Sequence, residues 1–349
     1  MIEFLSIKEL IDNERERCIV DVRSPIEYKK GHIPKAMNIP LFSNEERAII
    51  GRAYKQESKE RAFELDLDFA KKKKPYYLDR FRNLKGNPII HCWRGGMRSR
   101  KLAEFLEENG FQVGVLEKGY KAWRQKVQEE FARERKLLII GGYTGTGKTD
   151  LLHYLEAKGH QIIDLEGLAN HRGSAFGLLP EHVQPTTEQF ENNLFEELRK
   201  KDINYPLFVE DESAFIGNVF VPHYFYQQMK HAPMFFLEVP KETRAKKLAI
   251  DYGNYPEDLL WSDILKIKKR FSKKDLEDAK SCLYNGQLEK TAVYCLSYYD
   301  KMYDKALNKK SKTKVYKLRC ETTKSSDLWA CLEQELIKRN YVRNKTYSI

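Results

Sequence analysis

The sequence predicts two successive α/β domains, each built on a parallel sheet, with a basic and mostly helical region at the C-terminal end. Three observations support this fold class. A chain of 349 residues is longer than one ordinary domain. Short apolar runs of strand character alternate with segments of helical spacing, which is typical of parallel sheets flanked by helices. The excess of positive charge lies late in the chain.

The first domain is expected over residues 1–125. Buried strands are expected in three apolar runs, at residues 18–22, 87–92 and 113–116. A helix is expected over residues 98–109, because its leucines and phenylalanine recur on one face and Gly110 follows as a stop signal. The highly charged residues 41–85 are interpreted as an insertion between these elements.

The second domain follows a charged segment, residues 122–136, that is expected to be helical. Its part at 126–136 is the predicted linker helix. A domain core is expected over residues 137–240, with strands at 137–140, 207–209 and 234–239. Residues 241–349 are basic and rich in tyrosine, and we expect them to form the C-terminal part of the same domain.

Composition excludes several classes of protein. No apolar stretch approaches 18 residues, so no membrane-spanning helix is expected. The first ten residues lack the layout of a signal peptide, which favours the cytoplasm. The six cysteines form no C-x-x-C pair, so we expect reduced thiols and neither a zinc nor an iron–sulfur site.

The net charge of +11 is unevenly distributed. Residues 241–349 hold 25 Lys and Arg against 15 Asp and Glu, which leaves the first 240 residues almost neutral. A basic surface of this kind suggests a polyanion, and nucleic acid is the first candidate. An ordinary solvated helical surface would give the same charge, so charge alone leaves both interpretations open.

The most informative segment of the first domain reads His-Cys-Trp-Arg-Gly-Gly-Met-Arg over residues 91–98. Cys92 ends a predicted strand, and two glycines allow the following backbone to curl around the sulfur. Curled N–H groups, a helix N-terminus and two arginines favour the thiolate and bind oxyanions. We therefore expect a nucleophilic Cys92 in an anion pocket. The predicted pocket residues are Trp93, Arg94, Gly95, Gly96, Met97 and Arg98.

The second domain carries the string Gly-Tyr-Thr-Gly-Thr-Gly-Lys-Thr at residues 142–149, which fits G-x-x-x-x-G-K-[ST]. A strand before it and a helix after it are the context that a P-loop requires. Loop N–H groups would wrap a diphosphate, Lys148 would reach its outer oxygens, and Thr149 would hold Mg²⁺ if a metal is used. The predicted diphosphate-binding residues are Gly142, Gly145, Thr146, Gly147, Lys148 and Thr149.

Two further segments lie near this motif in the predicted sheet. The strand ending at residues 207–213 places Glu210 and Asp211 as a Walker B candidate, with Asp211 as a second Mg²⁺ contact if one is needed. The segment after residue 170 offers His171, Arg172 and Ser174 as candidates for contact with diphosphate or RNA. An ordinary turn explains the latter pattern equally well.

Three segments of the first domain resemble the rhodanese superfamily. They are the strand-turn-loop signature at 21–40, the Cys92 loop at the family's persulfide position, and Val-Leu-Glu-Lys-Gly-Tyr-Lys-Ala-Trp at 115–123. The resemblance implies a rhodanese-like fold. Arg98 follows Cys92 by six residues, whereas simple sulfurtransferases usually have five and cysteine phosphatases share the longer spacing. The loop alone leaves open whether it holds a phosphate ester or a larger group such as selenium.

The whole chain resembles the bacterial tRNA 2-selenouridine synthase family. The shared segments are the cysteine loop at 92–99, Tyr-Lys-Gln at 54–56, the P-loop at 142–149, His-Arg-Gly-Ser-x-Phe-Gly at 171–177 and Val-Glu-Asp-Glu-Ser at 209–213. The similarity runs from about residue 4 to at least residue 240, and the basic region matches only in character.

The resemblance implies conversion of 2-thiouridine to 2-selenouridine at the wobble position (position 34) of tRNAs for Lys, Glu and Gln. In the family, geranyl diphosphate first alkylates the sulfur to give S-geranyl-2-thiouridine. Selenium from selenophosphate then displaces the geranylthio group. On this basis the P-loop would bind the diphosphate, and Cys92 would take selenium as a selenylated cysteine, with Arg94 and Arg98 at the phosphate end.

For partners and cofactors, we expect contact with tRNA through residues 241–349, a monomer, no membrane contact and no tightly bound cofactor. The alternative is an ATP-dependent P-loop enzyme fused to a sulfurtransferase or a cysteine phosphatase. A non-catalytic RNA-binding module is a third hypothesis, and the intact cysteine loop and P-loop argue against it.

Overall fold

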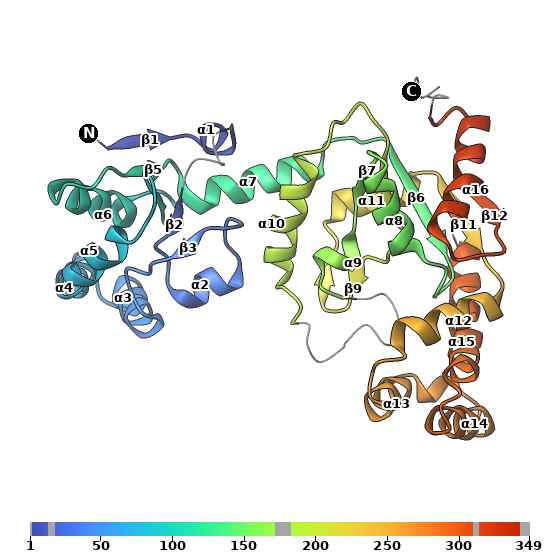
Figure 1. The fold of residues 1–349 in the computed structure, drawn as a ribbon. Coiled ribbons are helices and arrows are strands. Elements are labelled where there is room, and N and C mark those ends of the chain that lie inside the picture. Colours follow the sequence, from blue (N-terminus) through green and yellow to red (C-terminus); the bar gives the residue numbers. More distant parts are fainter. Residues whose placement is uncertain (1, 13–17, 172–182, 310–313, 343–349) are drawn as a thin grey trace. The chain divides into compact units, whose positions relative to one another are not determined.

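A computed structural model describes residues 2–12, 18–171, 183–309 and 314–342. The chain divides into two compact units, drawn in Figure 1. Unit 1 contains Met1–Phe131 and Glu191–Glu196, and unit 2 contains Ala132–Phe190 and Glu197–Ile349. Each unit is an α/β structure with its own parallel sheet, which confirms the predicted fold class.

The sheet of unit 1 has five parallel strands in the order β1-β5-β4-β2-β3. Their bounds are β1 Glu3–Leu5, β2 Ile19–Asp21, β3 Met37–Asn38, β4 Ile89–His91 and β5 Gly114–Leu116. Every residue of β2, β4 and β5 is buried. These strands are short apolar runs without alternation because helices cover both faces of a parallel sheet.

The helices of unit 1 follow the predicted alternation. They are α1 Ile7–Asp12, α2 Pro25–Lys30, α3 Asn44–Gln56, α4 Lys59–Lys72, α5 Lys74–Arg82, α6 Met97–Glu108 and α7 Gly119–Phe131. Helices α3 to α5 form the predicted insertion, and serines cap the first two of them, Ser43 at α3 and Ser58 at α4. The helix expected at 122–136 instead starts at Gly119 and ends at Phe131, whose side chain is buried.

Unit 1 also includes a segment from far along the chain, Glu191–Glu196. Its residue Asn192 is fully buried. The side-chain amide of Asn192 donates hydrogen bonds to the backbone oxygen of His32 and to the hydroxyl of Tyr120, both at 2.8 Å. Its oxygen accepts a hydrogen bond of 3.1 Å from the indole N–H of Trp123. A residue distant in sequence therefore satisfies buried polar groups of α7.

The sheet of unit 2 has five parallel strands in the order β12-β11-β6-β8-β7. Their bounds are β6 Leu137–Gly142, β7 Gln161–Ile163, β8 Leu207–Glu210, β11 Met234–Glu238 and β12 Val315–Arg319. A separate two-stranded antiparallel ribbon is formed by β9 Phe215–Ile216 and β10 Val219–Phe220. The P-loop strand β6 is central in the larger sheet.

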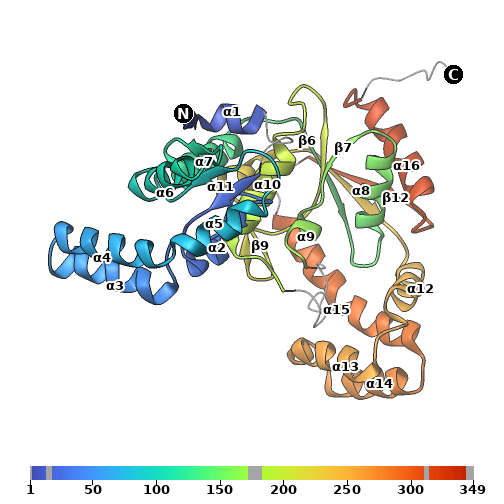
Figure 2. The same ribbon diagram turned by 60° about the vertical axis from the view of Figure 1, so that its left-hand side comes forward.

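On one face of this sheet, every second residue of a strand packs against helices in a common apolar core. Leu138 and Ile140 of β6 pack with leucines of α8 (Lys148–Ala157) and α16 (Ser325–Lys338). Figure 2 shows these two helices side by side. Three further helices belong to this part of the chain. They are α9 Leu165–Leu168, α10 Thr187–Leu198 and α11 His223–His231.

The C-terminal region is mostly helical, as predicted, and also supplies the edge strand β12. Its helices are α12 Lys241–Tyr252, α13 Glu257–Lys266, α14 Lys273–Tyr284, α15 Leu288–Lys309 and α16, with a 3₁₀ turn at Lys268–Arg270. Helices α12 to α15 pack around an apolar cluster of their own. None of the helices in the described part of the chain combines the length and apolar character that a bilayer crossing needs.

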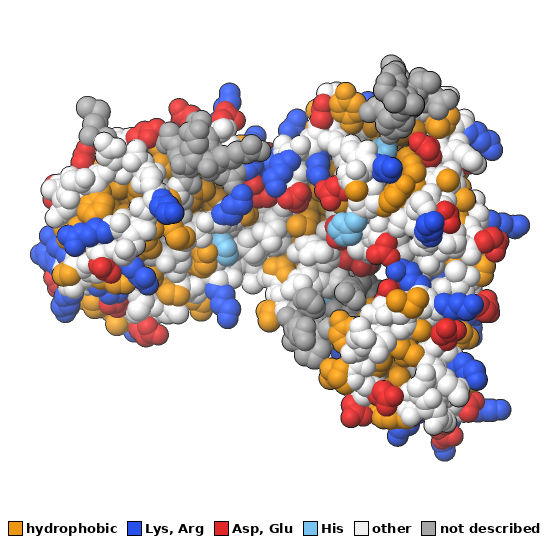
Figure 3. Space-filling model, in the orientation of Figure 1, with side chains coloured by type: hydrophobic (Ala, Val, Ile, Leu, Met, Phe, Trp, Pro, Cys, Tyr) orange, Lys and Arg blue, Asp and Glu red, His pale blue; other side chains and the backbone are white. Residues whose placement is uncertain are grey.

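Charged side chains on the visible face of unit 2 are mixed in sign. In Figure 3, Lys and Arg alternate with Asp and Glu over the C-terminal helices. On this face the late excess of positive charge does not gather into one patch.

Candidate functional site

Cys92 directly follows β4 and leads into the loop before α6. The carboxyl end of a buried strand and the N-terminus of a 12-residue helix therefore meet at this residue. Only 3% of Cys92 is exposed, and it borders the apolar core of unit 1. Because Cys92 is buried at the base of the loop, only small or closely fitting groups can reach its sulfur.

Two glycines allow the Cys92 loop to pack backbone against backbone. Gly95 has φ of +58°, and a Cβ there would lie 2.4 Å from the oxygen of Leu116. Gly119, at the start of α7, has φ of +54°, and a Cβ there would lie 2.2 Å from the oxygen of Cys92. The N–H of Tyr120 donates a 2.9 Å hydrogen bond to that same oxygen. The curl predicted from the glycines is thus fixed by the β5–α7 junction.

The thiol of Cys92 has polar neighbours on its loop side. Its sulfur lies 3.4 Å from the hydroxyl oxygen of Ser99. Burial by itself raises the pKa of Cys92, but the Ser99 hydroxyl, the charge of Arg98 and the backbone N–H groups of Ser99 and Arg94 together lower this pKa below its ordinary value. These neighbours favour the thiolate of Cys92 more than the surroundings of an ordinary cysteine do. Ser99 was not predicted, although a hydroxyl in the first turn of a helix beside a cysteine is a usable signal.

The other predicted loop residues differ in exposure. Trp93 and Arg94 are exposed, and Arg94 acts on the thiol through its backbone rather than its guanidinium. Gly96 precedes α6, and an added Cβ there would have no neighbour within 4 Å. Met97 is 54% exposed. Arg98 is half-buried, and its Nη1 atom has no hydrogen-bond partner among the described residues.

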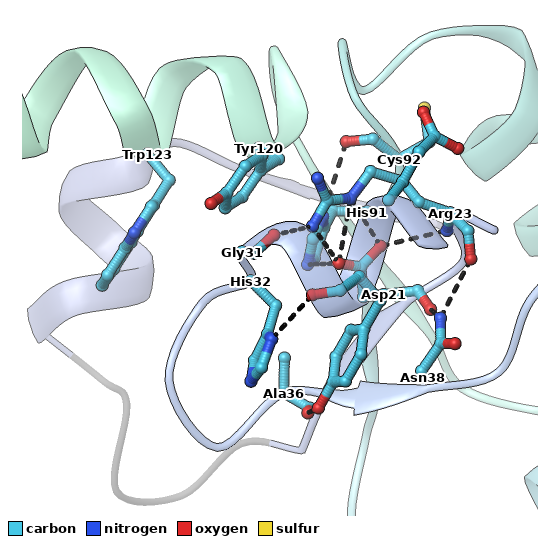
Figure 4. A network of polar contacts seen from close by, with 12 residues as sticks. Asp21, Arg23, Gly31, His32, Ala36, Asn38, His91, Cys92, Tyr120 and Trp123 are labelled. Carbon is cyan, nitrogen blue, oxygen red and sulfur yellow. Dashed lines mark hydrogen bonds and ion pairs between the residues drawn. The ribbon is translucent and has the colours of Figure 1, made fainter. Parts of the chain in front are cut away.

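A buried ion pair supports the strand ends beneath the loop (Figure 4). The guanidinium of Arg23 donates to both carboxylate oxygens of Asp21 and, at 2.6 Å, to the backbone oxygen of Gly31. The ring of Tyr120 lies 3.8 Å below the guanidinium carbon. His91 Nε2 is 3.9 Å from the Asp21 carboxylate. Burial raises the pKa of Asp21, but the neighbouring His91 and Arg23 lower it overall.

The P-loop has the curled form that the motif predicts. It contains all six predicted residues, Gly142, Gly145, Thr146, Gly147, Lys148 and Thr149, with the last two in the first turn of α8. The Lys148 ammonium donates a 3.1 Å hydrogen bond to the oxygen of Gly142. The Thr146 hydroxyl donates to the oxygen of Tyr143 at 2.6 Å. Gly147 caps α8 with φ of +89°.

Residues from α12 and α15 brace the P-loop, and no local sequence pattern indicates this role. Arg244 is buried and donates to the oxygen of Thr144 at 3.1 Å. The same guanidinium forms a two-point ion pair with Asp300, at 2.9 and 2.8 Å. One turn further along α15, Asp304 accepts a 2.7 Å hydrogen bond from the hydroxyl of Tyr143. Breaking such a buried pair on one side costs about 3–5 kcal/mol.

The Walker B candidates lie on β8, beside the P-loop strand β6. Glu210 is buried, and its Oε1 accepts a 2.8 Å hydrogen bond from the backbone N–H of Glu166. Its Oε2 has no hydrogen-bond partner within the described ranges. Burial raises the pKa of Glu210 well above its ordinary value, and nearby carboxylates add to the rise. Asp211 follows and donates its N–H to the oxygen of Ile140.

Lys148 lies in an acidic setting. Burial alone lowers the pKa of Lys148, but Tyr303, Glu166, Glu212 and Asp211 together raise it. The lysine Nζ is 5.7 Å from the centre of the Tyr303 ring. Burial and the charge of Glu166 raise the pKa of Glu212. The lysine therefore stays charged and available to phosphate oxygens.

His171 follows α9, and its N–H donates to the oxygen of Glu166. Burial lowers the pKa of His171 against the opposing charge of Glu166. The structure thus brings His171 toward the acidic residues around Lys148. Arg172 and Ser174 lie outside the described residues.

A parallel sheet with a cysteine loop, followed by a parallel sheet with a P-loop, defines a rhodanese-like domain joined to a P-loop domain. Comparison with known families agrees. Residues 5–126 match the family model "Rhodanese-like domain", and residues 135–263 match "tRNA 2-selenouridine synthase AAA domain". The chain belongs to the tRNA 2-selenouridine synthase family.

Relatives of that name are similar over most of the chain. A protein from Shewanella sediminis is 34% identical over 337 residues, which are 86% of this chain and 90% of that one. A Sulfurovum protein is 35% identical over 82% of this chain and 87% of its own. A Nitrosomonas europaea protein is 36% identical over 245 residues, which span 67% of this chain and 63% of that one. All three are named tRNA 2-selenouridine synthase.

Proposed function

We propose that this protein is a tRNA-modifying transferase that replaces sulfur with selenium at C2 of a wobble 2-thiouridine. The observation that carries the proposal is the Cys92 thiol, whose pKa is lowered at the N-terminus of α6, in a chain that also holds an intact P-loop. The names of its relatives support the same reaction. The proposed RNAs are tRNAs of the Lys, Glu and Gln type, modified in the cytoplasm by a monomer.

The P-loop is proposed to bind the diphosphate of geranyl diphosphate. The uridine sulfur attacks the first carbon of the geranyl group, a carbon–sulfur bond forms, and the carbon–oxygen bond to diphosphate breaks. Lys148 and the loop N–H groups would stabilise the charge on the leaving pyrophosphate. Tyr143 and Thr144 are held by α12 and α15, so the loop is preorganised for this role.

Magnesium fits the same loop. Thr149 and Asp211 would contact the ion, which would supply further neutralisation of phosphate charge. Nowhere in the described ranges do three His, Cys, Asp or Glu side chains gather as a metal site. A protein usually supplies only a few of the ligands of a phosphate-bound Mg²⁺, because water and substrate oxygens occupy the other coordination positions.

Cys92 is proposed to act as a nucleophile in the exchange: its thiolate forms a bond to C2 as geranylthiol leaves, and the selenium of selenophosphate then displaces the thiolate from C2. The selenylated cysteine expected from the resemblance would require an oxidant, because the selenium of the donor is already at the selenide level. In the balanced exchange a carbon–selenium bond forms at C2, the carbon–sulfur bond breaks, and geranylthiol leaves. Water takes up the phosphoryl group of the donor as phosphate, so no external oxidant or reductant is consumed overall. The unpartnered Nη1 of Arg98 and the N–H groups of the loop would bind the donor's phosphate oxygens.

Two variants separate the steps. Cys92→Ala is expected to abolish 2-selenouridine while geranylated tRNA accumulates, because only the exchange needs the thiolate. Lys148→Ala is expected to reduce geranylation at least a hundredfold, because a preorganised charge on the leaving group is lost. The measurement is mass spectrometry of tRNA nucleosides after incubation with geranyl diphosphate and selenophosphate, each alone and together.

Cys18→Ala is the matched control, because Cys18 is a half-buried thiol of the same unit with no role in the proposal. If the Cys92→Ala variant formed 2-selenouridine at the wild-type rate, the proposed role of Cys92 in the exchange would be wrong. Rapid ATP hydrolysis, or cleavage of p-nitrophenyl phosphate, without any change in tRNA would favour the nucleotide-driven alternative.

A further inference from the structure

A cavity of about 210 Å³ lies in unit 1 beside the Cys92 loop. It is enclosed by the insertion helices α4 and α5, by α6 and by the chain after β3. Most of its walls are hydrocarbon. The apolar lining includes Leu41, Phe42, Phe63, Leu67, Leu102 and Phe105.

The cavity adjoins the helix that follows the loop of the reactive cysteine. Met97 and Arg98 lie in the first turn of α6, directly after the Cys92 loop, and line the cavity. The charge of Arg98 acts on two groups, the Cys92 thiol and the carboxyl of Asp66 in the cavity wall. Arg98 thus lines the hollow and also acts on the sulfur.

The mouth combines exposed apolar surface with cations. Phe63 is 39% exposed and Met97 is 54% exposed, although both are large apolar side chains. Lys71, Lys74 and Lys101 also line the cavity and are exposed. The Lys101 ammonium donates a 2.7 Å hydrogen bond to Glu104, which leaves Lys71 and Lys74 as the main cations beside the hollow. An apolar hollow with cations beside it is complementary to an apolar chain that is attached to a polyanion.

We propose that this cavity receives the geranyl chain of S-geranyl-2-thiouridine tRNA during the exchange at Cys92. The inference rests on the proposed function and adds to it the place where the leaving group binds. The bond that breaks joins C2 to the sulfur carrying the chain, so the chain must lie in space that adjoins the Cys92 loop. The cavity is such a space, and the lysines at its mouth face the phosphates of the same RNA.

The proposal gives the insertion helices a role in substrate binding. They add no strand to the sheet, yet Phe63 and Leu67 of α4 form one wall of the hollow. The Lys74 ammonium lies 5.0 Å from the ring centre of Phe105 on the opposite wall. A short-chain substrate would leave these walls in contact with water, which makes the exchange selective for a long chain.

Filling the hollow tests the proposal. Leu67→Trp places a large ring in the cavity from α4. The substrates are anticodon stem-loop RNAs that carry S-geranyl-2-thiouridine or S-methyl-2-thiouridine, each supplied with selenophosphate. For the geranyl RNA we expect KM to rise at least tenfold in the variant with kcat little changed, because chain binding contributes equally before and during bond exchange. The preference of the wild-type protein for geranyl over methyl RNA should disappear.

Asp68→Trp is the matched control, since Asp68 is the exposed neighbour of Leu67 on α4 and lies outside the cavity lining. Alkylation of Cys92 by iodoacetamide at the wild-type rate verifies that unit 1 of each variant is folded. If Leu67→Trp and the wild-type protein converted geranyl RNA equally well, the cavity assignment would be overturned and the proposed function would stand. Failure of the wild-type protein to convert geranyl RNA would overturn the proposed function itself.

Phe63→Ala provides a second variant at an exposed position, where folding is least affected. It removes part of one wall and should also raise KM for the geranyl RNA. A wild-type KM for the geranyl RNA in Phe63→Ala would likewise contradict the assignment.

Discussion

Burial and neighbouring polar groups have opposing effects on the pKa of the Cys92 thiol. Burial in the core of unit 1 raises the pKa of the thiol, while Ser99, Arg98 and two backbone N–H groups lower it by a larger amount. Cys18, in the same unit, has burial without compensation, and its pKa is raised. Two thiols of one domain therefore differ in reactivity for reasons that depend on a few neighbouring atoms.

The contrast predicts the pH dependence of alkylation. A lowered pKa means that the thiolate of Cys92 is present at lower pH than an ordinary thiolate, so its alkylation should reach half-maximum at lower pH than that of Cys18. Ser99→Ala removes a hydrogen bond to the thiolate and should move the Cys92 profile to higher pH. Mass spectrometry of iodoacetamide-treated peptides measures both profiles. A Cys92 midpoint at or above that of Cys18 would contradict the assigned environment.

At the scale of elements, the functional loops are held by backbone contacts that only glycine permits. Gly95 and Gly119 bring the loop after β4 against the start of α7 at distances that leave no room for a side chain. Both have positive φ, where other residues are strained. The cradle around Cys92 is thus defined by two segments that meet across the end of the sheet.

This packing predicts a difference between neighbouring glycines. Gly95→Ala should lower the free energy of unfolding of unit 1 by about 1–3 kcal/mol, because it adds strain at positive φ and a backbone clash. Gly96→Ala should change it by less than about 1 kcal/mol, since φ there is −95° and the space is open. Urea denaturation measures both. Similar losses for the two variants would show that the loop is not packed as described.

The elements and motifs that depend on local sequence could be predicted, and those that depend on distant residues could not. The Cys92 loop and the P-loop were foreseen because a strand, glycines and a helix start lie within ten residues. Arg244 and Asp300 brace the P-loop from far along the chain, and nothing in their own surroundings indicates this role. Strand β12 was not predicted, although its sequence, Val-Tyr-Lys-Leu-Arg, alternates in the way that is typical of a partly exposed edge strand.

At the scale of the whole molecule, each unit has its own sheet and its own apolar core. Cys92 belongs to unit 1 and Lys148 to unit 2. Damage to one site therefore need not disturb the packing of the other. Under the proposed function, one uridine must visit both sites in turn.

This separation predicts complementation between variants. A mixture of Cys92→Ala and Lys148→Ala proteins should form 2-selenouridine, because one supplies geranylated tRNA and the other completes the exchange. The yield of 2-selenouridine nucleoside against time, compared with each variant alone, measures it. An inactive mixture of two individually half-active proteins would mean that tRNA stays on one molecule throughout.

The segment Glu191–Glu196 has a consequence for biosynthesis. All five strands of unit 1 are translated before Asn192, and the hydroxyl of Tyr120 and the indole N–H of Trp123 both form hydrogen bonds with that later residue. More than half of the polypeptide must be made before the N-terminal unit is whole. The nascent chain therefore cannot complete its first unit before synthesis of its second has begun.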